Sequence, residues 1–121
     1  MSGKPYPKHQ QLKHERLRQL RHVAGHAEMS AIREAKRGPC RCCNVNGRCH
    51  LHHLIPRARG GDDVADNLVP LCWVCHDLVH SRDPKTCMRL VWKLTDAEYS
   101  YAVEKCGEPV WESVYGIRYE R

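Results

Sequence analysis

The sequence predicts a small α+β fold, in which short strands lie between two cysteine pairs and helices flank them on both sides. Two Cys-x-x-Cys pairs begin at Cys40 and Cys72, and 28 residues separate one pair from the other. Extended apolar stretches and a glycine- and aspartate-rich loop fill this interval, whereas helical patterns precede and follow it. At 121 residues, the chain is expected to form a single compact unit with a core of about 80 residues.

The charge balance favours a polyanionic partner. The chain has 20 Lys and Arg against 14 Asp and Glu, a net charge of +6. Nucleic acid is the leading candidate, and a solvated basic surface is the alternative. The first 30 residues lack the apolar run of a signal peptide, and no stretch reaches the roughly 18 apolar residues of a membrane span. We therefore expect a cytoplasmic protein.

Residues 1–37 are predicted to form a basic arm and helix. Residues 1–9 are polar and contain two prolines, so we expect a flexible arm. Small apolar residues then recur at three- and four-residue steps up to Lys36, which predicts a helix that Gly25 bends or divides into two. This stripe buries little surface, so the helix is expected to need a partner: the cysteine-rich core, DNA or another copy. The stripe consists of Leu17, Leu20, Ala24, Ala27, Ala31 and Ala35.

Residues 38–82 are predicted to form the core. Gly38 and Pro39 are expected to end the helix, and residues 44–47 to form a knuckle or tight turn. A strand is predicted from Cys49 to Ile55, followed by a loop over residues 56–63. Asn67 begins a short apolar segment that leads to a helix from Trp73 to His80, which is expected to end before Pro84.

Residues 83–121 are predicted to form a helical extension packed on the core. Thr95-Asp-Ala-Glu98 is a capping box, in which the threonine and glutamate side chains satisfy free N–H groups at a helix start. Gly107 is a natural end for that helix. One more short helix is expected over residues 109–115.

The cysteine spacing predicts a structural zinc site. Two Cys-x-x-Cys pairs offer four thiolates to one tetrahedral ion, and so small a domain gains much of its folding free energy from such a site. Free thiols or disulfides are the alternative. Spacing also leaves open pairs that involve Cys42 or Cys49, whereas Cys87 and Cys106 are expected to be ordinary buried thiols. The favoured ligands are Cys40, Cys43, Cys72 and Cys75.

The histidine spacing predicts a second metal site. His76 and His80 lie four residues apart on the predicted helix and therefore share one face. A single divalent ion held between this helix and His52 on the strand would keep positions open for water and phosphate. His50 is expected to lie at the surface or strand edge.

These residues resemble the HNH endonuclease family, also called ββα-metal or His-Me finger. The resemblance covers about residues 38–82 and implies a zinc-stabilised, treble-clef-like ββα-metal core. It also implies hydrolysis of phosphodiester bonds in DNA, leaving 5′-phosphate and 3′-hydroxyl ends. The matching text is Cys40-x-x-Cys43, Leu51-His52-His53-Leu-Ile-Pro56, Gly60-Gly61-x-Asp63, Asn67-Leu and Leu71-Cys72-x-x-Cys75-His76.

The resemblance assigns a role to each of these polar residues. His52 and His76 would bind the catalytic divalent ion (Mg, Mn, Ni or Zn), and His80 matches a further histidine found in some members. His53 would be the general base that deprotonates water, a task suited to a group that titrates near neutral pH. Asn67 would orient His53 by hydrogen bonding and brace the loop.

The partner is expected to be double-stranded DNA, bound with low sequence specificity. Arg57 and Arg59 are candidates for phosphate contacts, with solvation of the loop as the alternative, and Asp62, Asp63 and Asp66 are expected to be hydrogen-bond acceptors in the loop. The tail is similar to those of small phage and prophage HNH proteins, which suggests a bacteriophage or mobile-element origin. The alternatives are a non-catalytic zinc module that binds DNA, or an accessory subunit of a packaging or recombination complex, and a homodimer is left open.

Overall fold

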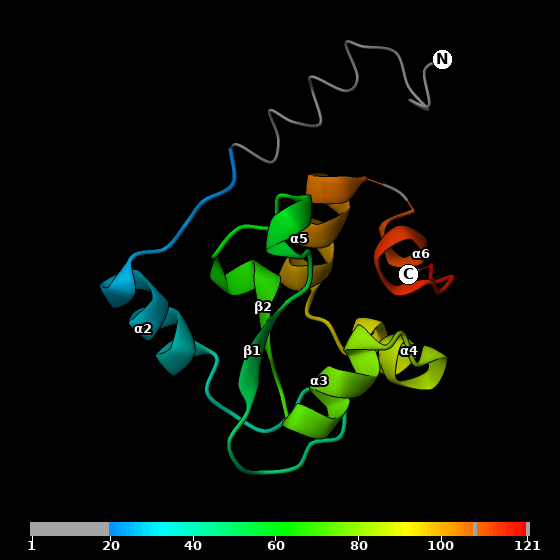
Figure 1. The fold of residues 1–121 in the computed structure, drawn as a ribbon, viewed down its shortest axis with the longest axis horizontal. Coiled ribbons are helices and arrows are strands. Elements are labelled where there is room, and N and C mark those ends of the chain that lie inside the picture. Colours follow the sequence, from blue (N-terminus) through cyan, green and yellow to red (C-terminus); the bar gives the residue numbers. More distant parts are fainter. Residues whose placement is uncertain (1–19, 108, 121) are drawn as a thin grey trace.

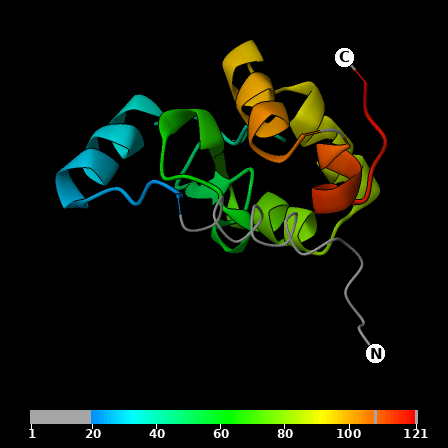
Figure 2. The ribbon, with the colours of Figure 1, turned by 90° about the horizontal axis from the view of Figure 1, so that it is seen from above.

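The computed structural model describes residues 20–107 and 109–120, and its centre is a two-stranded sheet with helices around it (Figure 1). Helix α2 lies on one side of the strands, and α4, α5 and α6 lie on the other in both views (Figures 1 and 2). The predicted small α+β class is therefore confirmed. The elements are α2 (His26–Ala35), β1 (His50–His53), β2 (Leu68–Leu71), α3 (Trp73–His80), α4 (Pro84–Trp92), α5 (Asp96–Cys106) and α6 (Val110–Tyr115), with short 3₁₀ turns at Arg57–Arg59 and Ala65–Asn67.

The two strands form an antiparallel pair that fixes the positions of the adjacent histidines. His52 pairs with Val69 and His53 with Leu68. All four residues of β2 are buried, which anchors the hairpin in the core. Because successive side chains of a strand point to opposite faces, His52 and His53 leave the hairpin in different directions.

The prediction for the N-terminal helix was partly wrong. Residues 21–25 are not helical, and α2 begins at His26 after an extended Gly25, so the prediction of one continuous helix through this stretch was wrong. Ala27, Ala31 and Ala35 are exposed and Ile32 is the buried residue, so the predicted stripe is not the face that α2 packs on the core; DNA or another copy stays its predicted partner. A branched aliphatic side chain removes more apolar surface from water than alanine, so it sets the buried face. The predicted arm at residues 1–9 and the first half of the predicted helix lie outside the described residues.

The helices after the strands follow local capping signals. α3 and α6 appear where they were predicted, and α5 begins with both hydrogen bonds of the Thr95–Glu98 capping box. Helix α4 was not predicted. Its signal was present, because Asp83 caps the helix by accepting from the Thr86 N–H and Pro84 occupies the first turn.

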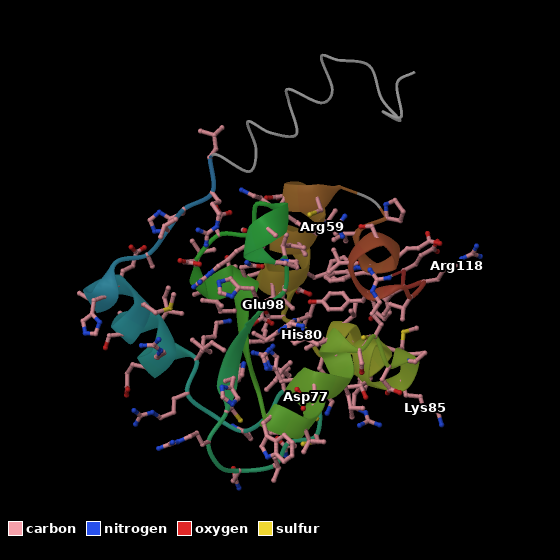
Figure 3. All side chains as sticks on the ribbon, viewed as in Figure 1. Arg59, Asp77, His80, Lys85, Glu98 and Arg118 are labelled. Atoms are coloured by element: carbon pink, nitrogen blue, oxygen red, sulfur yellow. The ribbon has the colours of Figure 1, made fainter. Side chains whose placement is uncertain are left out.

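The side chain of Glu98 joins three parts of the chain. It is fully buried and accepts hydrogen bonds from Lys36 Nζ at 2.6 Å, from the Arg41 guanidinium and from the Thr95 N–H at 2.8 Å. Burial raises the pKa of Glu98, but these bonds outweigh it and the pKa is lowered. In Figure 3 Glu98 lies near the centre of the molecule, whereas Lys85 and Arg118 lie at its rim.

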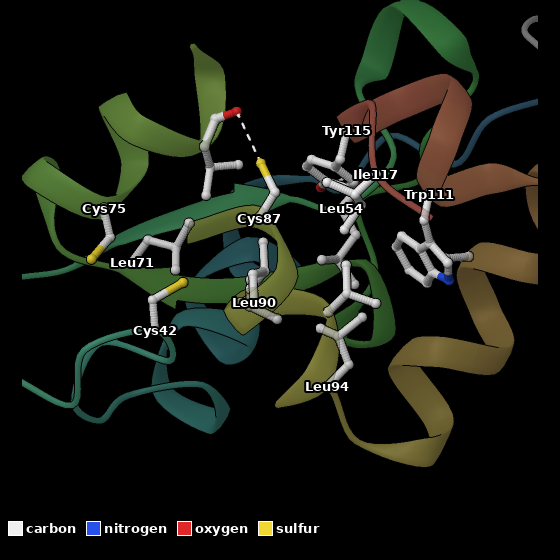
Figure 4. Packing of buried hydrophobic residues seen from close by; sticks show 14 of the residues in the cluster. Cys42, Leu54, Leu71, Cys75, Cys87, Leu90, Leu94, Trp111, Tyr115 and Ile117 are labelled. Carbon is white, nitrogen blue, oxygen red and sulfur yellow. Dashed lines mark hydrogen bonds between the residues drawn. The ribbon is translucent and has the colours of Figure 1, made fainter. Parts of the chain in front are cut away.

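Residues from the tail complete the hydrophobic core. Leu90 and Leu94 pack with Leu54 and Leu71, and Trp111, Tyr115 and Ile117 close the other end (Figure 4). Cys87 is fully buried as predicted, and its thiol donates to the carbonyl of Val79 (Figure 4). Cys106 is exposed, so the prediction that it is buried was wrong. In the described part of the chain, no helix is both long and apolar enough to cross a bilayer.

Candidate active site

The four predicted zinc ligands come together at one point. The sulphur atoms of Cys40, Cys43, Cys72 and Cys75 all lie within 4.8 Å of one another. A tight turn with Asn44 at a φ of 63° presents the first pair, and Cys72, at the N-cap of α3, presents the second. Four thiols at this spacing fit the tetrahedral ligand set that zinc prefers.

The alternative pairings with Cys42 and Cys49 are not the ones that the fold assembles. Neither residue belongs to the group of four sulphur atoms. Cys42 points into the core, where its thiol donates to the Thr86 carbonyl, and burial raises its pKa to about 12. Burial also opposes ionisation of Cys40, but backbone hydrogen bonds in the turn outweigh it and lower the pKa of Cys40 to about 6. A cation at this point would favour the thiolate form of all four ligands.

The second cluster consists of three imidazoles. Ring nitrogen atoms of His52, His76 and His80 all lie within 4.8 Å of one another. His76 and His80 occupy one face of α3, with their Nε2 atoms 3.1 Å apart, and the His52 ring lies 5.4 Å and 5.8 Å from theirs between ring centres. His50 lies outside this group, is exposed and stacks on His76.

The environment of His52 keeps it neutral. Burial first, and then the charges that His76 and His80 carry when protonated, lower the pKa of His52 to about 3. Burial likewise lowers the pKa of His76. A neutral imidazole has a lone pair for a metal ion, so three such rings at this distance fit a divalent transition metal.

His53 faces a carboxylate instead of the other histidines. Its Nε2 lies 2.9 Å from Asp63 Oδ1, and the Asp63 side chain is 2% exposed. Burial raises the pKa of Asp63, but bonds from His53 and the Ala24 N–H and the charges of Arg57 and Arg21 outweigh it, so the pKa is lowered. An ionised carboxylate is an acceptor, so in the neutral form of His53 the hydrogen is on Nε2 and the lone pair that a base needs is on Nδ1.

Asn67 does not make the predicted hydrogen bond to His53. Its side-chain oxygen accepts from the Ile55 N–H at 2.8 Å, and its amide nitrogen donates to the carbonyls of Ile55 and Asp62. The fully buried side chain therefore holds the loop against the end of β1. Gly61 permits this close approach, because a Cβ there would lie 1.7 Å from the Ile55 carbonyl oxygen.

Asp63 was predicted to be a hydrogen-bond acceptor, but its partner was not predicted. The carboxylate that orients His53 follows it by ten residues, in the Gly60-Gly61-x-Asp63 motif that was already part of the resemblance. The ten-residue separation of His53 and Asp63 in the sequence did not show that they are in contact, because the conformation of the intervening loop determines which strand residue Asp63 reaches.

A basic groove of about 810 Å³ runs between α2 and β1 and reaches His53 and His76. No acidic side chain lines it among the described residues. Arg57 lies in this groove, whereas Arg59 donates to the Ser113 carbonyl instead. The basic residues that line the groove are Arg33, Lys36, Arg37, Arg48 and Arg57.

Comparison with known proteins confirms the family resemblance. The family described as HNH endonuclease matches residues 40–82, the segment that holds the four cysteines and the three clustered histidines. The sequence is 32% identical to the type IV methyl-directed restriction enzyme EcoKMcrA of Escherichia coli over 71 residues, 50% of this chain and 26% of that protein. It is 39% identical to Anaredoxin of Nostoc sp. over 44 residues, 36% of this chain and 58% of that protein.

The chain thus spans about a quarter of the first relative's length and somewhat over half of the second's. No solved structure matches it. At the level of the family, these matches support a nuclease or DNA-binding activity.

Proposed function

We propose that the protein is a metal-dependent DNA endonuclease that hydrolyses phosphodiester bonds with low sequence specificity. His53 is the general base, and His52, His76 and His80 hold a catalytic divalent ion. The observation that supports this most directly is that the histidines fall into two groups. The ring nitrogen atoms of His52, His76 and His80 lie close together, whereas His53 is hydrogen-bonded to the buried carboxylate of Asp63.

The two groups of histidines would have different roles in phosphodiester hydrolysis. His53 would accept a proton from water at Nδ1, and Asp63 would stabilise the imidazolium that results. A divalent ion bound by the three imidazoles would stabilise negative charge on the phosphate and on the leaving oxygen. Asn67 would act as a structural brace for the loop that presents Asp63, not as a direct partner of the base.

The basic groove supports DNA as the substrate. Five Lys and Arg side chains line it, and it reaches the proposed base. Contacts with phosphates would give affinity that depends on salt and carries little sequence information. Arg57 lies beside Asp63, with Nε 3.4 Å from Oδ1, and we propose that it contacts the phosphate nearest the site. Arg59 would contact DNA only farther along the surface.

The four cysteines would hold a structural zinc that fixes α3 to the turn before β1. In this proposal residues 38–82 are the nuclease core, residues 1–37 a basic arm and helix, and residues 83–121 an extension packed on the core. A phage or mobile-element origin, a homodimer and a packaging or recombination partner stay predictions.

Cleavage of supercoiled plasmid tests the function. We expect Mg²⁺, Mn²⁺ or Ni²⁺ to support nicking by the wild type, EDTA to abolish it, and His53→Ala to lower the rate by about 10²- to 10⁴-fold. Circular dichroism and the zinc content of the variant must match those of the wild type. Equal cleavage by both proteins would refute His53 as the base, and no cleavage with any metal would favour the non-catalytic DNA-binding module.

A further inference from the structure

Tyr115, the last residue of α6, makes a hydrogen bond to one of the proposed metal ligands. Its hydroxyl oxygen lies 2.9 Å from His52 Nε2 and 2.6 Å from the carbonyl oxygen of Leu54. The tyrosine is 3% exposed, so these two groups surround its hydroxyl away from water. This residue lies outside the segment that matches the HNH family.

The Tyr115 hydroxyl has one hydrogen atom, and this fixes the donor and the acceptor in both of its hydrogen bonds. A carbonyl oxygen can only accept, so the single hydroxyl hydrogen of Tyr115 is directed at Leu54. The tyrosine oxygen must then accept from His52, which requires the hydrogen of the imidazole to be on Nε2. Burial raises the pKa of Tyr115, which keeps its hydroxyl protonated.

From this geometry we infer that Tyr115 is a positioning residue that holds His52 as the Nε2–H tautomer and thereby leaves the lone pair of Nδ1 for a metal ion. The inference rests on the proposed function, because it assigns the bare nitrogen to the metal. A fixed tautomer and a fixed ring orientation favour metal binding, because neither has to be selected when the ion arrives. The C-terminal extension would thus complete the metal site.

The test uses Tyr115→Phe, which removes the hydroxyl and keeps the ring in the core. Long-range ¹H–¹⁵N correlation spectra of the labelled protein report which nitrogen of His52 carries hydrogen before the metal is added. We expect Nε2–H in the wild type and a mixture of tautomers in the variant. Calorimetric titration with Ni²⁺ should show affinity lower by about 10- to 100-fold in the variant.

Tyr101→Phe is the matched control. Tyr101 also has a partly buried hydroxyl with a hydrogen-bond partner, because it donates to Asp62, but it does not contact the three imidazoles. Removing its hydroxyl should leave Ni²⁺ affinity unchanged. A control that weakened Ni²⁺ binding as much as Tyr115→Phe would overturn the inference, because the effect would then be a general loss of stability.

Two other results would also overturn it: hydrogen on Nδ1 of His52 in the wild type, or unchanged Ni²⁺ affinity in Tyr115→Phe. The first is measured on the unsubstituted protein, so it decides the matter even if the variant is unstable. Equal Ni²⁺ binding by the wild type and by His76→Ala would instead overturn the proposed metal site itself.

Discussion

Replacing Asp63 by asparagine tests the orientation of the proposed base. Oδ1 of Asp63 lies 2.9 Å from His53 Nε2 and accepts from Arg21 at 2.8 Å, while Oδ2 accepts from the Ala24 N–H at 3.1 Å. Each carboxylate oxygen therefore faces a donor. Whichever way the amide of an asparagine were turned, its NH₂ group would meet one of these donors.

The expected effect is a lower cleavage rate with unchanged metal affinity. A hydrogen bond to a charged group contributes about 1.5–3 kcal/mol, which corresponds to about a 10- to 150-fold lower rate if the bond strengthens as His53 becomes positive. The three imidazoles proposed to bind metal make no hydrogen bond to Asp63, so Ni²⁺ affinity should not change.

The assay is the single-turnover rate of plasmid nicking at neutral pH with saturating metal. Arg21→Gln is the matched control, because it disturbs the same anchoring of the N-terminal segment and leaves the contact between Asp63 and His53 intact. Wild-type cleavage by Asp63→Asn would refute the reasoning. An equal loss in Arg21→Gln would refute it too, because anchoring and not orientation would then explain the effect.

Two further predictions concern stability and DNA binding. Glu98→Gln leaves the partly buried cations of Lys36 and Arg41 without their buried counter-charge and should lower the free energy of unfolding by about 3–5 kcal/mol in urea denaturation. Glu34→Gln removes an exposed ion pair and should cost no more than about 1 kcal/mol. Since folding lowers the pKa of Glu98, its contribution to the free energy of unfolding is present above the ordinary carboxyl pKa and is lost as the pH falls through the lowered pKa. The free energy of unfolding of Glu98→Gln should therefore depend less on pH in the acid range. Replacing Arg33 and Arg48 with glutamine should weaken DNA binding, and the slope of log affinity against log salt concentration should fall by about 1 for each phosphate that the variant no longer binds. Arg118 lies remote from the groove, so Arg118→Gln should change neither the affinity nor the slope. Equal effects of both replacements in fluorescence anisotropy would contradict the placement of DNA in the groove.

Much of the local structure was predictable because its causes are short-range. The capping box at Thr95 predicted the start of α5, and the four-residue spacing of His76 and His80 predicted that they share one face of α3. α4 was predictable in principle from Asp83 and Pro84, and was missed. The error in α2 has a different cause, because the buried face of a marginal helix depends on what it packs against.

The sequence by itself determined which groups could bind metal. Cysteine pairs at fixed spacing and two histidines one helical turn apart carry their geometry locally, and the structure brings the predicted sets of four thiols and three imidazoles together. The hydrogen-bond partners of these groups were decided by the tertiary structure. Asp63 reaches His53 through a folded loop, and Tyr115 reaches His52 from 63 residues away through the packing of α6. Such contacts depend on how whole elements pack, which no local spacing specifies.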